Sequence, residues 1–156
     1  MNKKNTLLIF GFGYTAKFMC QKFSKKNWEV FCTTRFKEKV KEIESLNATP
    51  VFFDDEEKIE SILSKNSYIL STAPPENGKD PVIENYGYLF KKNRERIKWA
   101  GYLSTTSVYG DKKGGWVTED TVLEPNLERS ISRVAAEKSW LRSVSYTHLR
   151  AHETLP

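Results

Sequence analysis

A short glycine-containing turn near the N-terminus constrains this chain more than any other stretch. Leu7 to Phe10 is an apolar run with the length and composition of a β-strand. It leads directly into Gly11-Phe12-Gly13-Tyr14-Thr15-Ala16, which fits the pattern G-x-G-x-x-G/A. In that pattern the first glycine permits a tight turn, the second leaves room for a pyrophosphate, and Ala16 lets the next helix pack closely. The first N–H groups of that helix would face the phosphates. The alternative for so short a motif is an ordinary strand-to-helix turn.

The composition is that of one soluble globular domain. The chain has 156 residues, of which 38% are hydrophobic and 29% charged. The net charge of +5 comes from lysines spread along the sequence. We interpret them as solvated helix faces rather than as a nucleic-acid surface.

Cysteine use and apolar runs indicate a cytoplasmic protein. Cys20 and Cys32 match no zinc or redox spacing, so we expect buried free thiols in a reducing compartment and no metal site. The apolar stretch before Gly11 is too short for a signal peptide, and no run approaches the ~18 apolar residues of a membrane span. We therefore expect neither a membrane nor a nucleic-acid partner.

Strand-like and helix-like segments alternate along the chain. The expected strands are 7–10, 28–33, 50–53, 67–71 and 99–104, and the expected helices are 15–26, 36–46, 58–64 and 82–97. This alternation predicts the α/β class, with a Rossmann-type parallel sheet of about five strands in the order 3-2-1-4-5 and helices on both faces. The carboxyl ends of the strands then share one crevice, where such sheets bind ligands. That edge would carry the glycine turn, Arg35, Asp54, Ala73 and Thr105.

The end of the second strand favours NADP over NAD as the cofactor. An NAD-binding unit usually has Asp or Glu at this point, to bind the ribose hydroxyls. Here the strand ends in Thr33-Thr34-Arg35, without an acid. A carboxylate would repel a 2′-phosphate, whereas a guanidinium group can hold one with paired hydrogen bonds. The alternative is a solvent-facing arginine, with NAD as the cofactor.

The segment after the fifth strand carries a family resemblance. It contains Ser104-Thr105-Thr106-Ser107-Val108-Tyr109-Gly110, then Glu119-Asp120 and Glu124-Pro125, then Val134-Ala135-Ala136-Glu137. In this order, and together with the glycine turn, these motifs resemble the extended and atypical short-chain dehydrogenase/reductase superfamily, in its NAD(P)-dependent epimerase/dehydratase branch. The resemblance covers residues 6 to about 142.

The resemblance implies roles for individual residues. The phosphate turn would be Gly11, Phe12, Gly13 and Tyr14, and Arg35 would select NADP. Asp54 would contact the adenine, and Ala73 and Pro74 would lie near the nicotinamide ribose. Thr105 matches the catalytic Ser/Thr, whose hydroxyl would hydrogen-bond a substrate oxygen. All these residues stand at the matching motif positions of this sequence.

The catalytic Tyr-x-x-x-Lys pair of that family is not matched. Aligned on Ala135-Ala136-Glu137, its positions hold Arg129 and Arg133. Arginine cannot act as a general acid near neutral pH because its pKa exceeds about 12. Arg133 could still bind a ribose or phosphate as a fixed cation. Tyr109 is a substitute proton donor in principle, although it matches a structural tyrosine of the family.

The C-terminal segment differs in character from the rest. Residues from Val144 to Thr154 resemble the translation of a sequencing adapter, have no apolar periodicity and hold both histidines. We expect a domain of residues 1–142, truncated at its C-terminus, and a non-native tail of residues 143–156. A truncated sheet would expose apolar surface, so we expect a marginally stable fragment.

Three functions are consistent with these features. One is an NADP-dependent oxidoreductase or epimerase-like enzyme acting on an alcohol, carbonyl or sugar-nucleotide substrate. Another is a non-catalytic NADP(H)-binding scaffold or sensor, which the missing tyrosine favours. The last is a plain α/β domain that binds another nucleotide or none. The expected partners are a dinucleotide cofactor and a small-molecule substrate, with a homodimer as a possible assembly of the full-length form.

Overall fold

The computed structural model describes residues 4–144 as a parallel sheet surrounded by helices. The strands are β1 (Asn5–Phe10), β2 (Trp28–Thr34), β3 (Thr49–Phe52), β4 (Ser67–Ser71) and β5 (Ile97–Tyr102). The α-helices are α1 (Tyr14–Ser24), α2 (Val40–Ser45), α3 (Glu56–Leu63), α4 (Pro81–Lys92) and α5 (Glu128–Val144). Two 3-10 helices, η1 (Lys37–Lys39) and η2 (Thr106–Tyr109), complete the described elements. The expected tail lies outside the described residues, except for positions 143 and 144, which belong to α5.

The five strands form one sheet in the order β3-β2-β1-β4-β5, and every neighbouring pair is parallel. This confirms the Rossmann-type order predicted from the alternation of strands and helices. The central strand β1 is buried at every position after Asn5, as expected for a parallel strand that helices cover on both faces.

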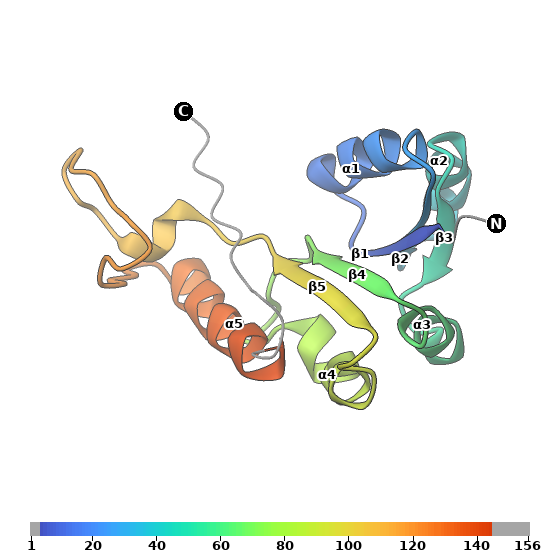
Figure 1. The fold of residues 1–156 in the computed structure, drawn as a ribbon. Coiled ribbons are helices and arrows are strands. Elements are labelled where there is room, and N and C mark those ends of the chain that lie inside the picture. The colour runs from blue at the N-terminus through green and yellow to red at the C-terminus, as the bar shows by residue number, and fades with distance from the viewer. Residues whose placement is uncertain (1–3, 145–156) are drawn as a thin grey trace.

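Helices cover both faces of the sheet. Figure 1 shows α1 and α2 on one side of the strands and α3, α4 and α5 on the other. Alternate residues of β1 serve the two layers, because successive side chains of a strand point to opposite faces. Leu7 and Ile9 pack in the cluster with α1 and α2, and Leu8 and Phe10 pack in the cluster with α3, α4 and α5.

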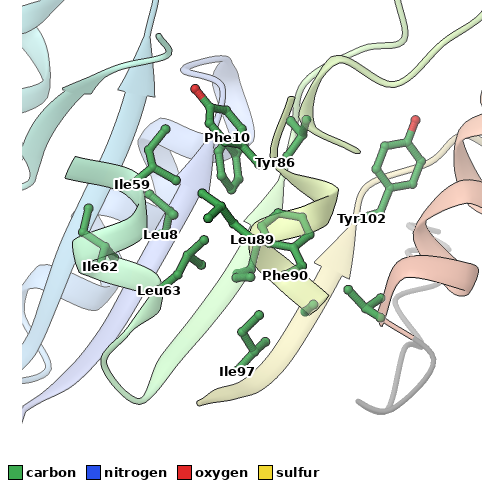
Figure 2. Packing of buried hydrophobic residues seen from close by; sticks show 14 of the residues in the cluster. Leu8, Phe10, Ile59, Ile62, Leu63, Tyr86, Leu89, Phe90, Ile97 and Tyr102 are labelled. Atoms are coloured by element: carbon green, nitrogen blue, oxygen red, sulfur yellow. The ribbon is translucent and has the colours of Figure 1, made fainter. Parts of the chain in front are cut away.

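A cluster of aromatic side chains, Phe10, Phe53 and Tyr86, packs at the carboxyl ends of β1 and β3, next to the glycine turn. Phe10 stacks on Tyr86 of α4 with ring centroids 5.7 Å apart (Figure 2). The Tyr86 hydroxyl also donates a hydrogen bond to the carbonyl of Phe53, just after β3. Burial, together with nearby acids led by Glu56, raises the pKa of Tyr86 to about 12, so the phenol stays protonated and remains a donor. One helix thus fixes the ends of both β1 and β3.

The fourth helix and the fifth strand differ from the ranges expected for them. The helix expected over 82–97 ends at Lys92, and a turn with a hydrogen bond from Arg96 N to Asn93 O (2.8 Å) follows. Ile97 is then the first residue of β5, where it pairs with Ser67 and is buried. The physical reason is that Ile97, although it fits the helical pattern, is buried where it pairs with β4. The strand ends at Tyr102 rather than at residue 104.

Within residues 4–144, no helix combines the length and the apolar character that crossing a membrane requires.

Candidate functional site

Gly11 makes a turn that another residue would strain. Its φ is +95°, a region that side chains rarely adopt. A Cβ built on it would lie 2.8 Å from Thr72 Oγ1 and 3.2 Å from the backbone nitrogen of Ala73. The neighbouring strand holds the turn, because Gly11 N donates to Thr33 Oγ1 (2.9 Å) and Cys32 Sγ donates to Gly11 O (3.3 Å). Gly11 is therefore needed for the fold itself.

Gly13 differs from Gly11, because the space in front of it is open. A Cβ built on Gly13 would have no atom within 4 Å, and its backbone is in the extended region that any residue adopts. Gly13 is the N-cap of α1, no side chain caps that end, and the first turn contains no acid. The N–H groups of the first turn are thus available to an anion, as at other helix N-termini that bind phosphate. Ala16 is fully buried below them. This part of the chain fits the diphosphate of a dinucleotide.

Arg35 lies just after β2 and is already engaged. Its Nη1 is 2.6 Å from Oε1 of Glu76, and its guanidinium carbon lies 4.6 Å from the centre of the Phe53 ring. Both charged side chains are about half exposed, at 46% and 50%. Asp54 follows Phe53 and is exposed. The guanidinium therefore has a fixed aromatic platform and an edge that faces solvent.

A cavity of about 660 Å³ runs from the start of α1 to η2 and α5. Of the residues predicted for the site, it brings together Gly13, Tyr14 and Thr105, with Arg133 and Tyr109 also in its wall. The other predicted residues are not in this wall: Gly11, Phe12, Arg35, Asp54, Ala73, Pro74 and Arg129. The cavity thus joins the phosphate turn to the predicted catalytic threonine.

The Thr105 hydroxyl belongs to a short chain of hydroxyl groups. Thr105 Oγ1 accepts a hydrogen bond from Ser107 N (3.3 Å) and lies 3.2 Å from Ser107 Oγ. Ser130 of α5, which is fully buried, donates to Ser107 Oγ (2.8 Å). These contacts hold Thr105 Oγ1 at the cavity wall, where its O–H can be donated to a ligand oxygen.

The two arginines at the family's Tyr-x-x-x-Lys positions differ in location. Arg133 Nη1 donates to Leu103 O (2.8 Å) and to the hydroxyl of Tyr102 (3.1 Å), so its cation is held in the cavity wall. Arg129, one turn earlier on α5, is exposed. Arg133 is therefore placed to bind a ligand, whereas Arg129 is not.

Asp80 forms a buried polar group behind Arg133. Its Oδ1 accepts from Val82 N (3.0 Å) and Ile83 N (2.9 Å), which caps α4. Burial raises the pKa of this carboxyl above its ordinary value. The backbone hydrogen bonds, the Trp140 side chain and the positive charge of Arg133 lower the pKa, but they do not outweigh the effect of burial. Burial also raises the pKa of Tyr102 to about 12, although Arg133 opposes this change. Asp80 and Tyr102 therefore both sense the positive charge of Arg133.

Tyr109 lies in the same wall, with 8% of its surface exposed. Burial raises the pKa of its phenol, and the carboxylates of Glu137 and Glu119 raise it further. A raised pKa keeps the phenol protonated at neutral pH and makes it a weaker acid, which disfavours Tyr109 as the proton donor.

The cavity wall also holds polar side chains for which the sequence predicted no role, among them Thr72, Ser104, Glu119 and Glu137. Thr72 directly follows β4, so its place at the carboxyl edge of the sheet was a signal that could have identified it. Ser104, Glu119 and Glu137 belong to the motifs that carry the family resemblance, which assigned them no role in the site. Among the described residues, no group of three or more His, Cys, Asp or Glu side chains is arranged to hold a metal ion.

Comparison with known proteins identifies the fold. No protein-family model matches the chain, and no curated protein sequence matches it. Among solved structures, a conserved protein of unknown function from Silicibacter pomeroyi DSS is 34% identical, with a TM-score of 0.82 over 92% of this chain and 50% of its own. A putative epimerase from Burkholderia cenocepacia J2315 is 14% identical, with a TM-score of 0.74 over 93% of this chain and 52% of its own. A mutant UDP-glucuronic acid 4-epimerase from Bacillus cereus, solved with NAD and a fluorinated UDP-sugar, is 20% identical. Its TM-score is 0.66 over 92% of this chain and 54% of its own.

These matches place the chain among Rossmann-type folds, in which epimerases and reductases are frequent neighbours. The chain spans about half the length of the solved structures that it matches.

Proposed function

We propose that the protein is an NADP-dependent oxidoreductase or epimerase-like member of the extended and atypical short-chain dehydrogenase/reductase superfamily. Its substrate would be an alcohol, a carbonyl compound or a sugar nucleotide. The observation that carries the proposal is the cavity that joins the open space at Gly13 to the Thr105 hydroxyl. Solved neighbours that contain NAD support a nicotinamide dinucleotide as the class of cofactor.

Each residue has a defined part in this proposal. The N–H groups at the start of α1 bind the diphosphate, and Arg35 binds the 2′-phosphate. When bound, the cofactor would supply the redox chemistry, with NADPH giving a hydride to the substrate or NADP⁺ accepting one from it. Thr105 donates its hydroxyl hydrogen to a substrate oxygen, and Arg133 holds a ribose or phosphate group as a fixed cation. Asp54, Ala73 and Pro74 keep the adenine and ribose contacts that the family resemblance assigns to them.

A non-catalytic NADP(H)-binding scaffold is the second candidate. Arg129, at the position of the family's tyrosine, is exposed and absent from the cavity wall, and Tyr109 is a poor proton donor. Both the enzyme and the scaffold would bind NADP(H), so the cofactor site does not distinguish between them.

Turnover separates the two candidates. NADPH oxidation by the protein should be measured across a panel of carbonyl compounds and sugar nucleotides, with the T105V variant as the control. The enzyme proposal expects oxidation with at least one substrate and its loss in T105V, while NADPH binding is retained. Tight NADPH binding without turnover of any substrate would support the scaffold instead.

A further inference from the structure

We propose that Glu76 reduces the preference for NADP over NAD by engaging the guanidinium group of Arg35. The inference rests on the proposed function, because it concerns the same nucleotide site. Glu76 lies in the loop after β4, 41 positions from Arg35 in sequence, and their 2.6 Å contact joins the carboxyl ends of β2 and β4.

A hydrogen-bonded turn holds the backbone of Glu76. Glu76 N donates to Lys79 O (2.8 Å) and Lys79 N donates to Glu76 O (2.9 Å), so the two residues close a hairpin. The central residues Asn77 and Gly78 have φ values of 49° and 75°, as in the tight turns that asparagine-glycine pairs favour. Lys79 uses its ammonium group on Glu84 (3.0 Å) rather than on Glu76. Among the described residues, Arg35 is the ion-pair partner of Glu76.

Glu76 accepts a hydrogen bond from Nη1, one of the two outer nitrogens of Arg35. The guanidinium group lies over the Phe53 ring, so the ring occupies one face and the N–H edge remains for an acceptor. A carboxylate and a 2′-phosphate both require those N–H donors. A carboxylate left beside a bound phosphate would also repel it. A 2′-phosphate that binds through paired hydrogen bonds including Nη1 must therefore displace Glu76, whereas NAD, which lacks the 2′-phosphate, does not compete for that nitrogen.

The exposure of the pair determines how large the effect is. Both side chains are about half exposed, and ion pairs of this kind are weak in water. Glu76 thus adjusts NADP affinity rather than blocking it. Removing its charge should tighten NADPH binding by about two- to five-fold, and the gain should shrink as salt screens the pair.

The test is a titration of E76Q against the wild-type protein with four probes: NADPH, NADH, adenosine 2′,5′-bisphosphate and ADP. E29Q is the matched control, because Glu29 on β2 is also about half exposed, forms a 3.2 Å ion pair with Lys65 and undergoes the same change of charge. E76Q should bind NADPH and the bisphosphate about two- to five-fold more tightly. NADH and ADP should bind E76Q as they bind the wild type, and E29Q should match the wild type with all four probes.

Two results would overturn the inference while leaving the proposed function in place. One is an unchanged ratio of NADPH to NADH affinity in E76Q, when both nucleotides still bind. The other is an equal gain in E29Q, which would show a general effect of net charge. If none of the four probes bound to any variant, the proposed nucleotide site would itself be wrong and the inference would fall with it.

Discussion

Replacing Gly11 by alanine should destabilise the fold, whereas replacing Gly13 by alanine should weaken nucleotide binding and leave the fold intact. At Gly11 the backbone has φ +95°, so alanine costs about 1–2 kcal/mol for the left-handed conformation. The new methyl group would also lie 2.8 Å from Thr72 Oγ1 and 3.2 Å from Ala73 N, and relieving such crowding costs about 1–3 kcal/mol. The sum is about 2–5 kcal/mol, or roughly 5–15 °C in the melting temperature of a chain of this size.

The same methyl group at Gly13 meets no atom within 4 Å. Two small effects on stability oppose each other there. Alanine restricts the unfolded chain and so stabilises by about 0.4–1 kcal/mol, but it is a poorer N-cap than glycine by a similar amount. The free energy of unfolding should stay within about 1 kcal/mol of the wild-type value. In the complex, the methyl group would lie where the diphosphate approaches the backbone, and crowding of about 1–3 kcal/mol corresponds to a loss of about 5- to 150-fold in NADPH affinity.

The assay combines thermal unfolding, followed by circular dichroism, with NADPH titration, followed by nicotinamide fluorescence. The two variants control for each other, because each adds one methyl group to the same turn. If G13A bound NADPH as tightly as the wild type does, the open space at Gly13 would not be the diphosphate site. If G11A and G13A lowered the melting temperature equally, the contrast between the crowded surroundings of Gly11 and the open space at Gly13 would be wrong.

Two further substitutions test the cofactor edge and the buried carboxylate. R35D should move the preference from NADPH toward NADH, because a carboxylate repels the 2′-phosphate and accepts from ribose hydroxyls; an unchanged ratio of dissociation constants would remove the role of Arg35. D80N keeps an acceptor for the N–H of Val82 but cannot ionise. Since burial raises the pKa of Asp80 in the folded state, its ionisation removes stability as the pH rises from about 3.8 through that raised pKa. In urea unfolding, the free energy of unfolding of D80N should rise relative to that of the wild type as the pH increases over this range. If the two proteins showed the same dependence of that free energy on pH, the raised pKa of Asp80 would be contradicted.

The sheet and its order were predictable because the pattern is local. Each strand is a short apolar run followed by a helix-like stretch, and a right-handed parallel crossover leaves few arrangements for such a chain. The end of the fourth helix was not predictable in this way. Ile97 fits the helical periodicity of the preceding residues, and only its burial beside β4 places it in a strand.

The roles of the site residues stay predictions, but the neighbourhood of two of them could be foreseen. The glycine turn was selected from a local motif and Thr105 from the family resemblance, and the structure places Gly13 and Thr105 in the wall of one cavity. Contacts between segments that lie far apart in the chain could not be predicted from the sequence. Nothing in the spacing links Arg35 to Glu76, or Ser107 to Ser130, and each pair meets only because the parallel strands and α5 bring their ends together.

The central claim is tested most directly by titrating the wild-type protein with NADPH and, separately, with NADH. The account predicts saturable binding of one NADPH per chain, with a lower dissociation constant than for NADH. An absence of NADPH binding would contradict the claim that this fold holds a dinucleotide at the start of α1.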